Sequence, residues 1–340
     1  MSLLTDMITN NALKILESTD LSALDNKTLL VTGASGLIGI HMITCLREVR
    51  ERVRPKKIYA LVNREPLSFI RELLDFEGVQ VLRGDLTNTG FCESLPAADC
   101  IIHAACYGQP IRFMEDPIKT LKLNTLTTFS LLEKLEVGGK FLFISTSEVY
   151  TGLSDPPFAE TQIGTTDPGH PRACYIEAKR CGEAIVNVCR SKGADAKSAR
   201  LALAYGPGTR MGDKRVISEF IQRGFDKEIR LMDQGAARRA YCYVTDAVEL
   251  MWKILISGRE SVYNVGGVSE RSIAQLAQTI GDMMNASVVF PDTPQEVKGG
   301  PMNAWVDMTR ANTEFGKKEY VSLEDGLAQT IEWYRVLRAS

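Results

Sequence analysis

The sequence has little that could build a metal centre or a disulfide framework. Its eight cysteines include no Cys-x-x-Cys pair, and its three histidines are scattered along the chain. Structural zinc sites and small disulfide-rich domains need cysteines and histidines at short, regular spacings. We therefore expect no bound metal, and we expect reduced thiols that are mostly packed in the interior.

An excess of one charge and long apolar runs are also missing. The 40 Lys and Arg against 42 Asp and Glu leave a formal net charge of −2. This balance offers no attraction for nucleic acid or for an anionic membrane. No apolar run is long enough to span a bilayer, and residues 1–26 lack the charged-then-apolar layout of a signal peptide. We expect a cytoplasmic protein that has neither nucleic acid nor membrane as a partner.

A glycine-rich stretch, Val31–Gly39, lies between a strand predicted over residues 27–31 and an amphipathic helix predicted over residues 37–50. Its spacing is Gly-x-x-Gly-x-x-Gly, a variant of the commoner Gly-x-Gly-x-x-Gly. Such a turn lets the backbone approach a pyrophosphate, whose charge then faces the N–H groups and the positive end of the following helix. The stretch predicts a dinucleotide-binding turn, with a glycine turn that holds no ligand as the alternative.

Further apolar runs predict strands over residues 57–62, 79–83, 99–103 and 140–144, with helices between them, including a long one from Pro117 to Glu136. Nearly continuous apolar strands that alternate with helices indicate a parallel sheet covered on both faces. The predicted fold class is α/β, a doubly wound parallel-sheet (Rossmann) domain with a smaller C-terminal substrate-binding lobe.

The predicted domain organisation follows from where this alternation begins and ends. We assign residues 1–26 to an N-terminal helical extension and residues 27–204 to the dinucleotide-binding domain. Residues 205–340 are assigned mainly to the substrate-binding lobe, with segments near 238–267 returning to the first domain. Within this part we expect helices around 216–224, 246–255 and 322–337 and a strand over 262–265.

The second predicted strand ends in Asn63 and Arg64. In a dinucleotide fold, an acidic residue at this strand end accepts from the ribose 2′-hydroxyl, whereas a basic one accommodates a 2′-phosphate. The acid is missing here and an arginine is present, so the sequence leaves NAD and NADP both open.

Hydroxyls and a carboxylate follow the strand over 140–144, where parallel sheets bind their ligands. A helix expected over residues 172–192 then carries Tyr175 and Lys179 four residues apart on one face. Because a neighbouring cation favours the phenolate, we expect Tyr175 to exchange a proton with a substrate hydroxyl near neutral pH. His103, at another strand end, is interpreted as structural.

Together these features resemble the extended short-chain dehydrogenase/reductase family, whose members modify nucleotide sugars with a nicotinamide cofactor. The resemblance runs through most of the chain and rests on Thr32–Gly39, Asp85-Leu86, His103-Ala104-Ala105, Asn124, Ser145–Tyr150, Tyr175 with Lys179, Tyr205-Gly206-Pro207, Arg239 and Val262–Gly267. Within the family, the chain is most similar to UDP-glucuronate decarboxylases, through residues 117–122, 145–150, 171–175 and 179–180.

The resemblance implies a role for each residue of the site. Thr146 hydrogen-bonds the reacting hydroxyl, Tyr175 is the base and Lys179 binds the nicotinamide ribose. Glu148 assists near the sugar. Substrate-binding residues are Ser147, Arg215 and Arg239, and we expect a homodimer. The implied site for NAD or NADP consists of Gly33, Ser35, Gly36, Leu37, Ile38, Gly39, Asn63, Arg64, Asp85, Leu86, Ala104, Ala105, Asn124, Tyr175 and Lys179.

The chain departs from the family pattern in several places. Leu203 replaces an asparagine that contacts the substrate diphosphate, Asn63 replaces the acid, and no C-terminal arginine is evident near residues 302–307. Ser147 stands where sugar 4,6-dehydratases carry an aspartate, which disfavours elimination of water.

The expected reaction is decarboxylation of a UDP-hexuronic acid such as UDP-glucuronate through a transient 4-keto intermediate. A 4-epimerase or a 4-ketosugar reductase would use the same Thr, Tyr and Lys, and is the main alternative. A 4,6-dehydratase and a non-catalytic NAD(P)-binding protein are less favoured.

Overall fold

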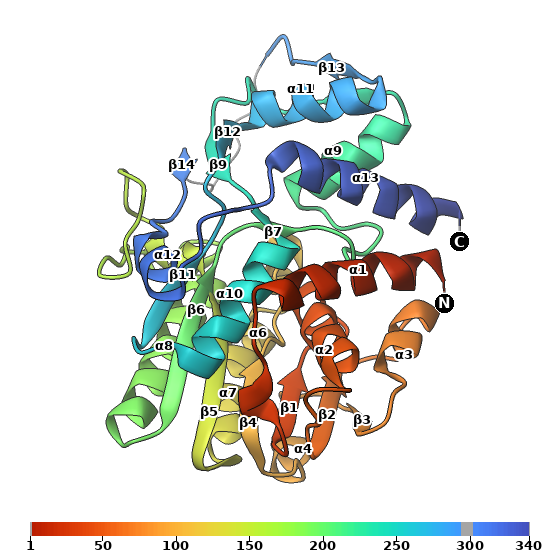
Figure 1. Cartoon of the computed structure of the whole chain (residues 1–340). Coiled ribbons are helices and arrows are strands. Elements are labelled where there is room, and N and C mark those ends of the chain that lie inside the picture. Colours follow the sequence, from red (N-terminus) through yellow and green to blue (C-terminus); the bar gives the residue numbers. More distant parts are fainter. Residues whose placement is uncertain (1, 294–301, 340) are drawn as a thin grey trace.

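A seven-stranded sheet forms the centre of the computed structural model, which describes residues 2–293 and 302–339 (Figure 1). Its order is β11-β6-β5-β4-β1-β2-β3, and every neighbouring pair is parallel. The predicted doubly wound parallel sheet is confirmed. The strands are β1 (Thr28–Thr32), β2 (Lys57–Val62), β3 (Val79–Arg83), β4 (Ala98–His103), β5 (Leu135–Thr146), β6 (Asp195–Leu201) and β11 (Val262–Val265).

Helices cover both faces of this sheet because successive strand residues point to opposite sides. Leu29 and Val31 pack into one apolar cluster, whereas Leu30 packs into the other. The first cluster is covered by α1 (Leu3–Glu17), α2 (Leu37–Val49), α3 (Ser68–Leu74) and α10 (Val244–Ser257). The second is covered by α4 (Thr89–Glu93), α6 (Pro117–Asn124), α7 (Leu126–Leu132) and α8 (Ala173–Ser191).

The single helix predicted over residues 117–136 is wrong. It breaks at Thr125 into α6 and α7, and strand β5 already begins at Leu135. The hydroxyls of Thr125 and Thr128 donate to the carbonyls of Leu121 and Asn124, and such back-bonding bends helices. Past the break, Leu135 pairs with strand β4, where a register shift marks a bulge.

Helix α1 belongs to the layer that covers the sheet. Its Ile8, Ala12 and Ile15 are buried, and the helix packs against α2, α10, α3 and α13 (Leu323–Ala339). The hydroxyl of Ser2 caps it by accepting from the Thr5 N–H at 3.2 Å. The sequence predicted a helical extension over residues 1–26, and the structure places the apolar face of its helix in the core.

A smaller lobe lies beyond the carboxyl ends of the strands, at the top of Figure 1. Its helices are α9 (Val216–Phe225), α11 (Ile273–Met284) and α13. Two small sheets complete it, one of β8 (Glu228–Arg230) and β13 (Ser287–Val289), and one of β9 (Arg238–Ala240), β12 (Glu270–Ser272) and β14 (Asn303–Ala304). This arrangement is consistent with the predicted C-terminal lobe.

Short elements connect the two parts. Strands β7 (Ala204–Tyr205) and β10 (Cys242–Tyr243) pair in parallel where the chain enters and leaves the lobe. Helix α12 (Thr309–Phe315) returns to contact β11. The remaining elements are α5 (Pro110–Glu115) and the 3-10 helices η1 (Ser22–Leu24) and η2 (Ser147–Tyr150).

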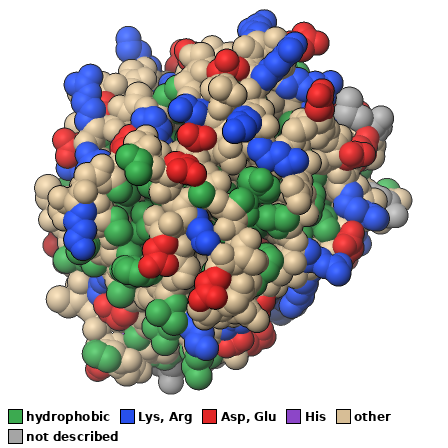
Figure 2. All heavy atoms as spheres, turned by 90° about the horizontal axis from the view of Figure 1, so that it is seen from below, with side chains coloured by type: hydrophobic (Ala, Val, Ile, Leu, Met, Phe, Trp, Pro, Cys, Tyr) green, Lys and Arg blue, Asp and Glu red, His purple; other side chains and the backbone are tan. Residues whose placement is uncertain are grey.

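One face of the molecule mixes charges of both signs. On the face seen from below Figure 1, acidic and basic side chains are interspersed with small apolar groups (Figure 2).

Within residues 2–293 and 302–339, no helix has the length and apolar character needed to cross a membrane.

Candidate active site

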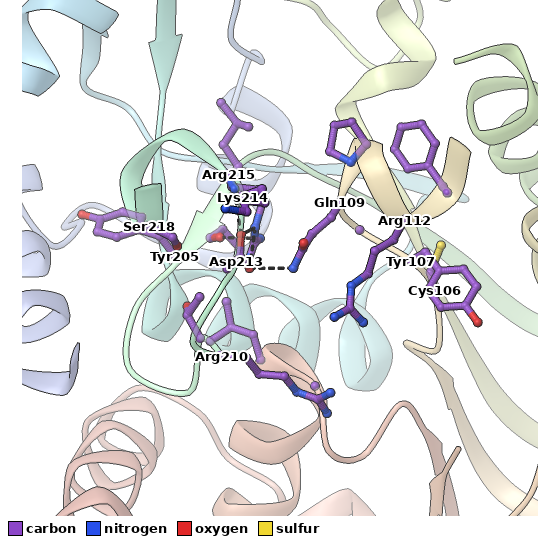
Figure 3. A pocket seen from close by; sticks show the side chains of 18 of the residues that line it. Cys106, Tyr107, Gln109, Arg112, Tyr205, Arg210, Asp213, Lys214, Arg215 and Ser218 are labelled. Atoms are coloured by element: carbon purple, nitrogen blue, oxygen red, sulfur yellow. Dashed lines mark hydrogen bonds and ion pairs between the residues drawn. The ribbon is translucent and has the colours of Figure 1, made fainter. Parts of the chain in front are cut away.

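One cavity of about 910 Å³ lies between the carboxyl ends of the sheet strands and the C-terminal lobe (Figure 3). It brings together almost all of the residues that the sequence assigned to the site. Those that line it are Gly33, Ser35, Gly36, Leu37, Ile38, Gly39, Asn63, Arg64, Asp85, Leu86, Ala104, Ala105, Thr146, Ser147, Glu148, Tyr175, Lys179, Arg215 and Arg239.

Asn124 is the exception. Its side chain is fully buried and does not line the cavity; its Nδ2 donates to the Thr120 carbonyl at 2.8 Å. Asn124 Oδ1 is buried without a hydrogen-bond partner in the described part of the chain. The proposed contact of Asn124 with a cofactor stays a prediction.

The glycine turn has the shape of a phosphate cradle. Gly33 has a φ of +66°, and a Cβ there would lie 2.8 Å from the Ala104 carbonyl carbon. A Cβ on Gly39 would lie 2.3 Å from the Gly33 carbonyl oxygen. Gly36 caps helix α2, and no side chain among the described residues bonds to this cap. The first N–H groups of the helix therefore suit an anion, and the turn fits the pyrophosphate of a dinucleotide.

His103 contacts the end of strand β1, just before the glycine turn. Its Nδ1 lies 2.9 Å from Thr32 Oγ1, and its Nε2 lies 3.0 Å from the Leu123 carbonyl oxygen. Burial, aided by the charge of Lys179, lowers the pKa of His103 to about 3. A neutral ring held between two strands and a helix matches its interpretation as a structural residue.

The residues expected to exchange protons meet where β5 ends. The Thr146 hydroxyl hydrogen-bonds the Tyr175 phenol and also accepts from the Glu148 N–H at 3.2 Å. The Tyr175 ring stacks on Phe113, with ring centroids 4.4 Å apart and the planes 4° from parallel. A threonine hydroxyl and a buried phenol thus face the same cavity, within reach of one substrate hydroxyl.

The pKa of Tyr175 does not follow the sequence-based expectation. Burial raises it well above the usual range, and Cys106 and Glu148 add to the rise, whereas the Thr146 hydrogen bond and the charge of Arg172 act in the opposite direction. Lys179 Nζ lies 5.9 Å from the Tyr175 ring centroid and donates instead to the Ile144 carbonyl at 2.5 Å. The four-residue spacing places Lys179 on the same face of helix α8 as Tyr175, as predicted, but its ammonium group points to strand β5.

Glu148 forms the polar wall next to this pair. It makes an ion pair with Arg172, and burial raises its pKa while Arg172, Arg239 and His170 act in the opposite direction. Its second oxygen, Oε2, is buried with no hydrogen-bond partner among the described residues. The wall of the cavity therefore contains a buried oxygen that could accept a hydrogen bond or, when protonated, donate one.

Several lining residues escaped the sequence analysis. The Cys106 thiol hydrogen-bonds the Lys179 ammonium, and Phe113 supplies the ring under Tyr175. Gln109 Nε2 donates to Asp213 Oδ2 at 3.0 Å, which joins the two sides of the cavity (Figure 3). An isolated cysteine, glutamine or phenylalanine carries no local signal, although Cys106, Gln109 and Phe113 all lie in the segment that follows the predicted strand β4.

Arg215 is already occupied by a protein carboxylate. Its Nη2 donates to Asp213 Oδ2 at 2.7 Å, and its Nε lies 3.0 Å from Oδ1 and 3.1 Å from Oδ2 of the same carboxylate. Its Nη1 donates to the Ala204 carbonyl at 3.1 Å. This bidentate pair fixes the loop that follows β7.

Leu203 stands out for its backbone. Its φ is +36°, a left-handed conformation that asparagine tolerates better than leucine, and it lines the cavity. The family's asparagine therefore fits this backbone, and leucine keeps the turn without offering a polar group to a ligand.

Within the described ranges, no group of three or more His, Cys, Asp or Glu side chains lies close enough to hold an ion.

Comparison with known proteins agrees with this geometry. The model of the NAD dependent epimerase/dehydratase family matches residues 29–266. The chain is 30% identical to UDP-glucuronic acid decarboxylase 1 of Xenopus tropicalis over 318 residues, covering 93% of this chain and 74% of that protein. It is 29% identical to UDP-glucuronic acid decarboxylase 6 of Arabidopsis thaliana over 321 residues, covering 92% and 90%.

A solved structure is similar in both fold and sequence. UDP-glucose 4-epimerase from Thermotoga maritima, crystallised with UDP-glucose, superposes with a TM-score of 0.79 and 25% identity, covering 92% of this chain and 99% of that one. These matches confirm the resemblance inferred from the sequence. With the family model matching 238 consecutive residues of the 340, this chain belongs to the NAD dependent epimerase/dehydratase family.

Proposed function

We propose that this protein decarboxylates a UDP-hexuronic acid such as UDP-glucuronate, using NAD or NADP, through a transient 4-keto intermediate. The observation that carries the proposal is the meeting of Thr146, Tyr175 and Lys179 in the same cavity as the glycine cradle. A protein that only bound a dinucleotide would have no need of this set. The relatives named UDP-glucuronic acid decarboxylase support the choice of reaction.

Proton transfer at C4 is assigned to Tyr175. Its phenolate accepts the proton of the C4 hydroxyl, and the Thr146 hydroxyl, which already bonds the phenol, holds both groups in line. A nicotinamide bound next to the glycine turn would supply the acceptor and donor of the C4 hydride, and the positive charge of its oxidised ring would lower the pKa of the buried Tyr175 phenol. Lys179 holds the nicotinamide ribose.

Loss of CO₂ follows from the position of the new ketone. A C4 carbonyl is β to the C6 carboxylate, so the electron pair of the breaking C5–C6 bond passes into the C4 enolate. C5 takes up one proton from solvent, which replaces the CO₂ that has left. The proton that Tyr175 took from the C4 hydroxyl goes back to that oxygen when C4 is reduced again, which gives a UDP-pentose. No hydroxyl leaves the sugar, which agrees with Ser147 in place of the dehydratase aspartate.

Binding roles complete the proposal. Residues of the glycine turn hold the pyrophosphate, while Asn63, Arg64, Asp85, Leu86, Ala104 and Ala105 surround the rest of the cofactor. Ser147, Glu148, Arg215 and Arg239 bind the nucleotide sugar. The division into a helical extension, residues 27–204 as the cofactor domain and residues 205–340 as mainly the substrate lobe is retained as part of the proposal.

The test is CO₂ release and product mass with UDP-glucuronate and added or co-purified NAD(P). We expect one CO₂ per UDP-pentose formed and no net change in NAD(P)H, because the hydride returns to the sugar. An isomeric product of unchanged mass without CO₂ would instead establish an epimerase. Stoichiometric consumption of NAD(P)H on a 4-ketosugar would establish a reductase.

We further propose that the protein acts as a cytoplasmic homodimer. All eight cysteines are free, as expected in a reducing compartment. Helices α6 and α7 present large apolar side chains to the outside: Ile118 is 66% exposed, Leu121 41%, Leu126 63% and Phe129 53%. Large apolar side chains exposed on two consecutive helices are typical of a protein interface.

Replacing Phe129 by Glu should therefore dissociate the dimer, because a charge in the middle of an apolar interface loses its hydration. Light scattering is expected to show a mass near twice 37.6 kDa for the wild-type protein and near 37.6 kDa for the variant. Leu67→Glu, which is exposed on another part of the surface, is the matched control and should remain dimeric. A wild-type monomer would contradict the proposal.

A further inference from the structure

Helix α1 lies between the layer that covers the sheet and the C-terminal lobe. In Figure 1 it lies below α13 of the lobe and above α2 and α3, and contacts join it to all three helices. It also contacts α10, which belongs to the layer on the sheet. None of the residues Leu3–Glu17 lines the cavity. The helix therefore packs against both parts of the molecule without contributing to the site itself.

A chain of buried polar groups crosses this contact at Asn11. The residue is 1% exposed, and its Nδ2 lies 3.3 Å from Nε2 of His41 on α2. Its Oδ1 lies 3.4 Å from the hydroxyl of Tyr243 on β10. That hydroxyl also lies 2.9 Å from Oε1 of Gln329 on α13. One side chain of α1 thus connects α2 with a strand and a helix that attach the lobe.

His41 sets the direction of these hydrogen bonds. Burial lowers the pKa of His41 to about 4, so its ring is neutral. Its Nδ1 lies 2.8 Å from the Leu37 carbonyl oxygen, which can only accept, so Nδ1 carries the hydrogen and Nε2 accepts from Asn11 Nδ2. The Asn11 Oδ1 is then an acceptor, and it shares the hydrogen of the Tyr243 hydroxyl with Gln329 Oε1. The neutral ring therefore turns the Asn11 carbonyl toward the lobe.

The lobe side of this contact carries residues of the cavity wall. Strand β10 follows Arg239, which lines the cavity. Helix α13 holds the loop after β7, because Trp333 Nε1 donates to the Thr209 carbonyl at 2.7 Å and the Tyr334 hydroxyl donates to the Arg210 carbonyl at 3.3 Å. Thr209 and Arg210 also line the cavity. A shift of β10 or α13 relative to α1 would therefore move this wall against the end of strand β5.

We infer that helix α1 is a brace that fixes the spacing between the two walls of the cavity, with Asn11 as its positioning residue. Apolar surfaces alone tolerate small shifts, whereas a buried polar network is satisfied in only one arrangement. Asn11 thus holds the lobe wall where it binds the nucleotide sugar. The inference goes beyond the proposed function and rests on it only for the sugar used in the kinetic measurement.

Hydrogen exchange tests the brace without any ligand. Asn11→Leu keeps a side chain of similar size and removes both hydrogen bonds. Tyr243→Phe removes only the hydroxyl, and its ring stays against Tyr205, 5.5 Å away between centroids. We expect the amides of residues 204–210 and 239–243 to exchange about ten-fold faster in either variant, because a lost buried hydrogen bond changes the opening equilibrium by roughly that factor.

Kinetics and cofactor binding show which wall has moved. The KM for UDP-glucuronate should rise about ten-fold in both variants while kcat changes little, which is the sign of lost binding rather than lost chemistry. The Kd of NAD⁺ and of NADP⁺ should change much less. The glycine turn precedes α2, and His41 on that helix keeps its hydrogen bond to the Leu37 carbonyl.

Thr5→Val is the matched control. The Thr5 hydroxyl donates to Glu72 Oε2 at 2.8 Å, and Glu72 lies on α3 in the layer on the sheet. This variant should lose stability as Asn11→Leu does, but its KM and the exchange of the lobe segments should match the wild-type protein. A merely structural role of Asn11 would instead give the two variants the same KM and the same exchange.

Two results would overturn the brace. One is equal behaviour of Asn11→Leu and Thr5→Val in the exchange of residues 204–210 and 239–243. The other is a rise in the Kd of NAD⁺ as large as the rise in KM, which would place the effect of Asn11 on the glycine turn. Failure of the wild-type protein to convert UDP-glucuronate would refute the proposed reaction, and the exchange measurement would still decide the brace.

Discussion

Replacing Tyr175 by Phe is expected to reduce kcat by about 10²- to 10⁴-fold, the usual contribution of a positioned general acid or base. The substitution removes one oxygen and leaves the ring, so the stack on Phe113 at 4.4 Å is preserved. What is lost is the phenol that the Thr146 hydroxyl bonds. The affinity for NAD⁺ or NADP⁺ should change little, because the phenol is a minor part of the cofactor site.

The measurement pairs steady-state turnover with cofactor titration. Tyr59→Phe provides the control, since this phenol lies on strand β2 and does not line the cavity. Its kcat should match that of the wild-type protein. Retention of the wild-type rate by Tyr175→Phe would remove Tyr175 from the mechanism, and a parallel loss of cofactor affinity would reduce its role to binding.

The positions of these residues could be predicted because they follow from regular geometry. A parallel sheet directs the carboxyl ends of its strands to one edge, so residues after β1, β2, β4 and β5 had to meet there. The four-residue spacing of Tyr175 and Lys179 put both on one helical face. Their electrostatics could not be predicted in this way, because the pKa of Tyr175 depends on burial and on where the Lys179 ammonium finds an acceptor.

The cavity residues that the sequence did not reveal lie in two segments that connect the main elements of the fold. Cys106, Gln109 and Arg112 follow strand β4, whereas Arg210 and Asp213 follow β7, and these segments meet only in the folded chain. Their approach depends on long-range packing and leaves no periodic signal. Asn124 is the opposite case. The family resemblance assigned it to the cofactor site, but in the folded chain it is buried and does not line the cavity.

Strand β6 escaped the sequence analysis for a related reason. Lys197, Ser198 and Arg200 interrupt its apolar character, yet all three are buried. Lys197 reaches Asp195, and Arg200 reaches Glu183 on helix α8. Polar residues can occupy a central strand when such partners satisfy them, but the partner of Arg200 is not visible from the strand alone.

The pair of Glu183 and Arg200 is expected to dominate the stability of this region. Each residue is only 5% exposed. Arg200 Nη2 donates to Glu183 Oε2 at 2.8 Å, and its Nε lies 3.1 and 3.2 Å from the two carboxylate oxygens. Burial alone lowers the pKa of Arg200, but the hydrogen bond and the charge of Glu183 outweigh burial and raise it. The guanidinium is therefore held in its charged form.

The same pair connects to the end of strand β5. The Ser145 hydroxyl donates to Glu183 Oε1 at 2.5 Å, and Arg200 Nη1 donates to the Tyr150 hydroxyl at 2.9 Å. Ser145 immediately precedes Thr146, so the network fixes the backbone that presents the Thr146 hydroxyl to Tyr175. Loss of the carboxylate is expected to affect both stability and the alignment of the site.

Glu183→Gln should lower the free energy of unfolding by about 3–5 kcal/mol, because it leaves the buried guanidinium without a counter-charge. Urea denaturation measures the change. Glu219→Gln is the matched control, since it breaks a half-exposed pair with Arg223 on helix α9 and should cost about 0.5 kcal/mol or less. A loss for Glu183→Gln no larger than that of the control would show that the buried pair is not a major source of stability.

A double replacement distinguishes the cost of an unpaired charge from the value of the pair itself. In Glu183→Leu with Arg200→Met, both charges are removed together and apolar side chains fill the space, so most of the lost stability should return. Turnover should not return with it, because the Ser145 hydroxyl still lacks its acceptor and the end of β5 is no longer held. Recovery of stability without recovery of kcat would identify the pair as a positioning device for Thr146, whereas recovery of both would limit its role to charge compensation.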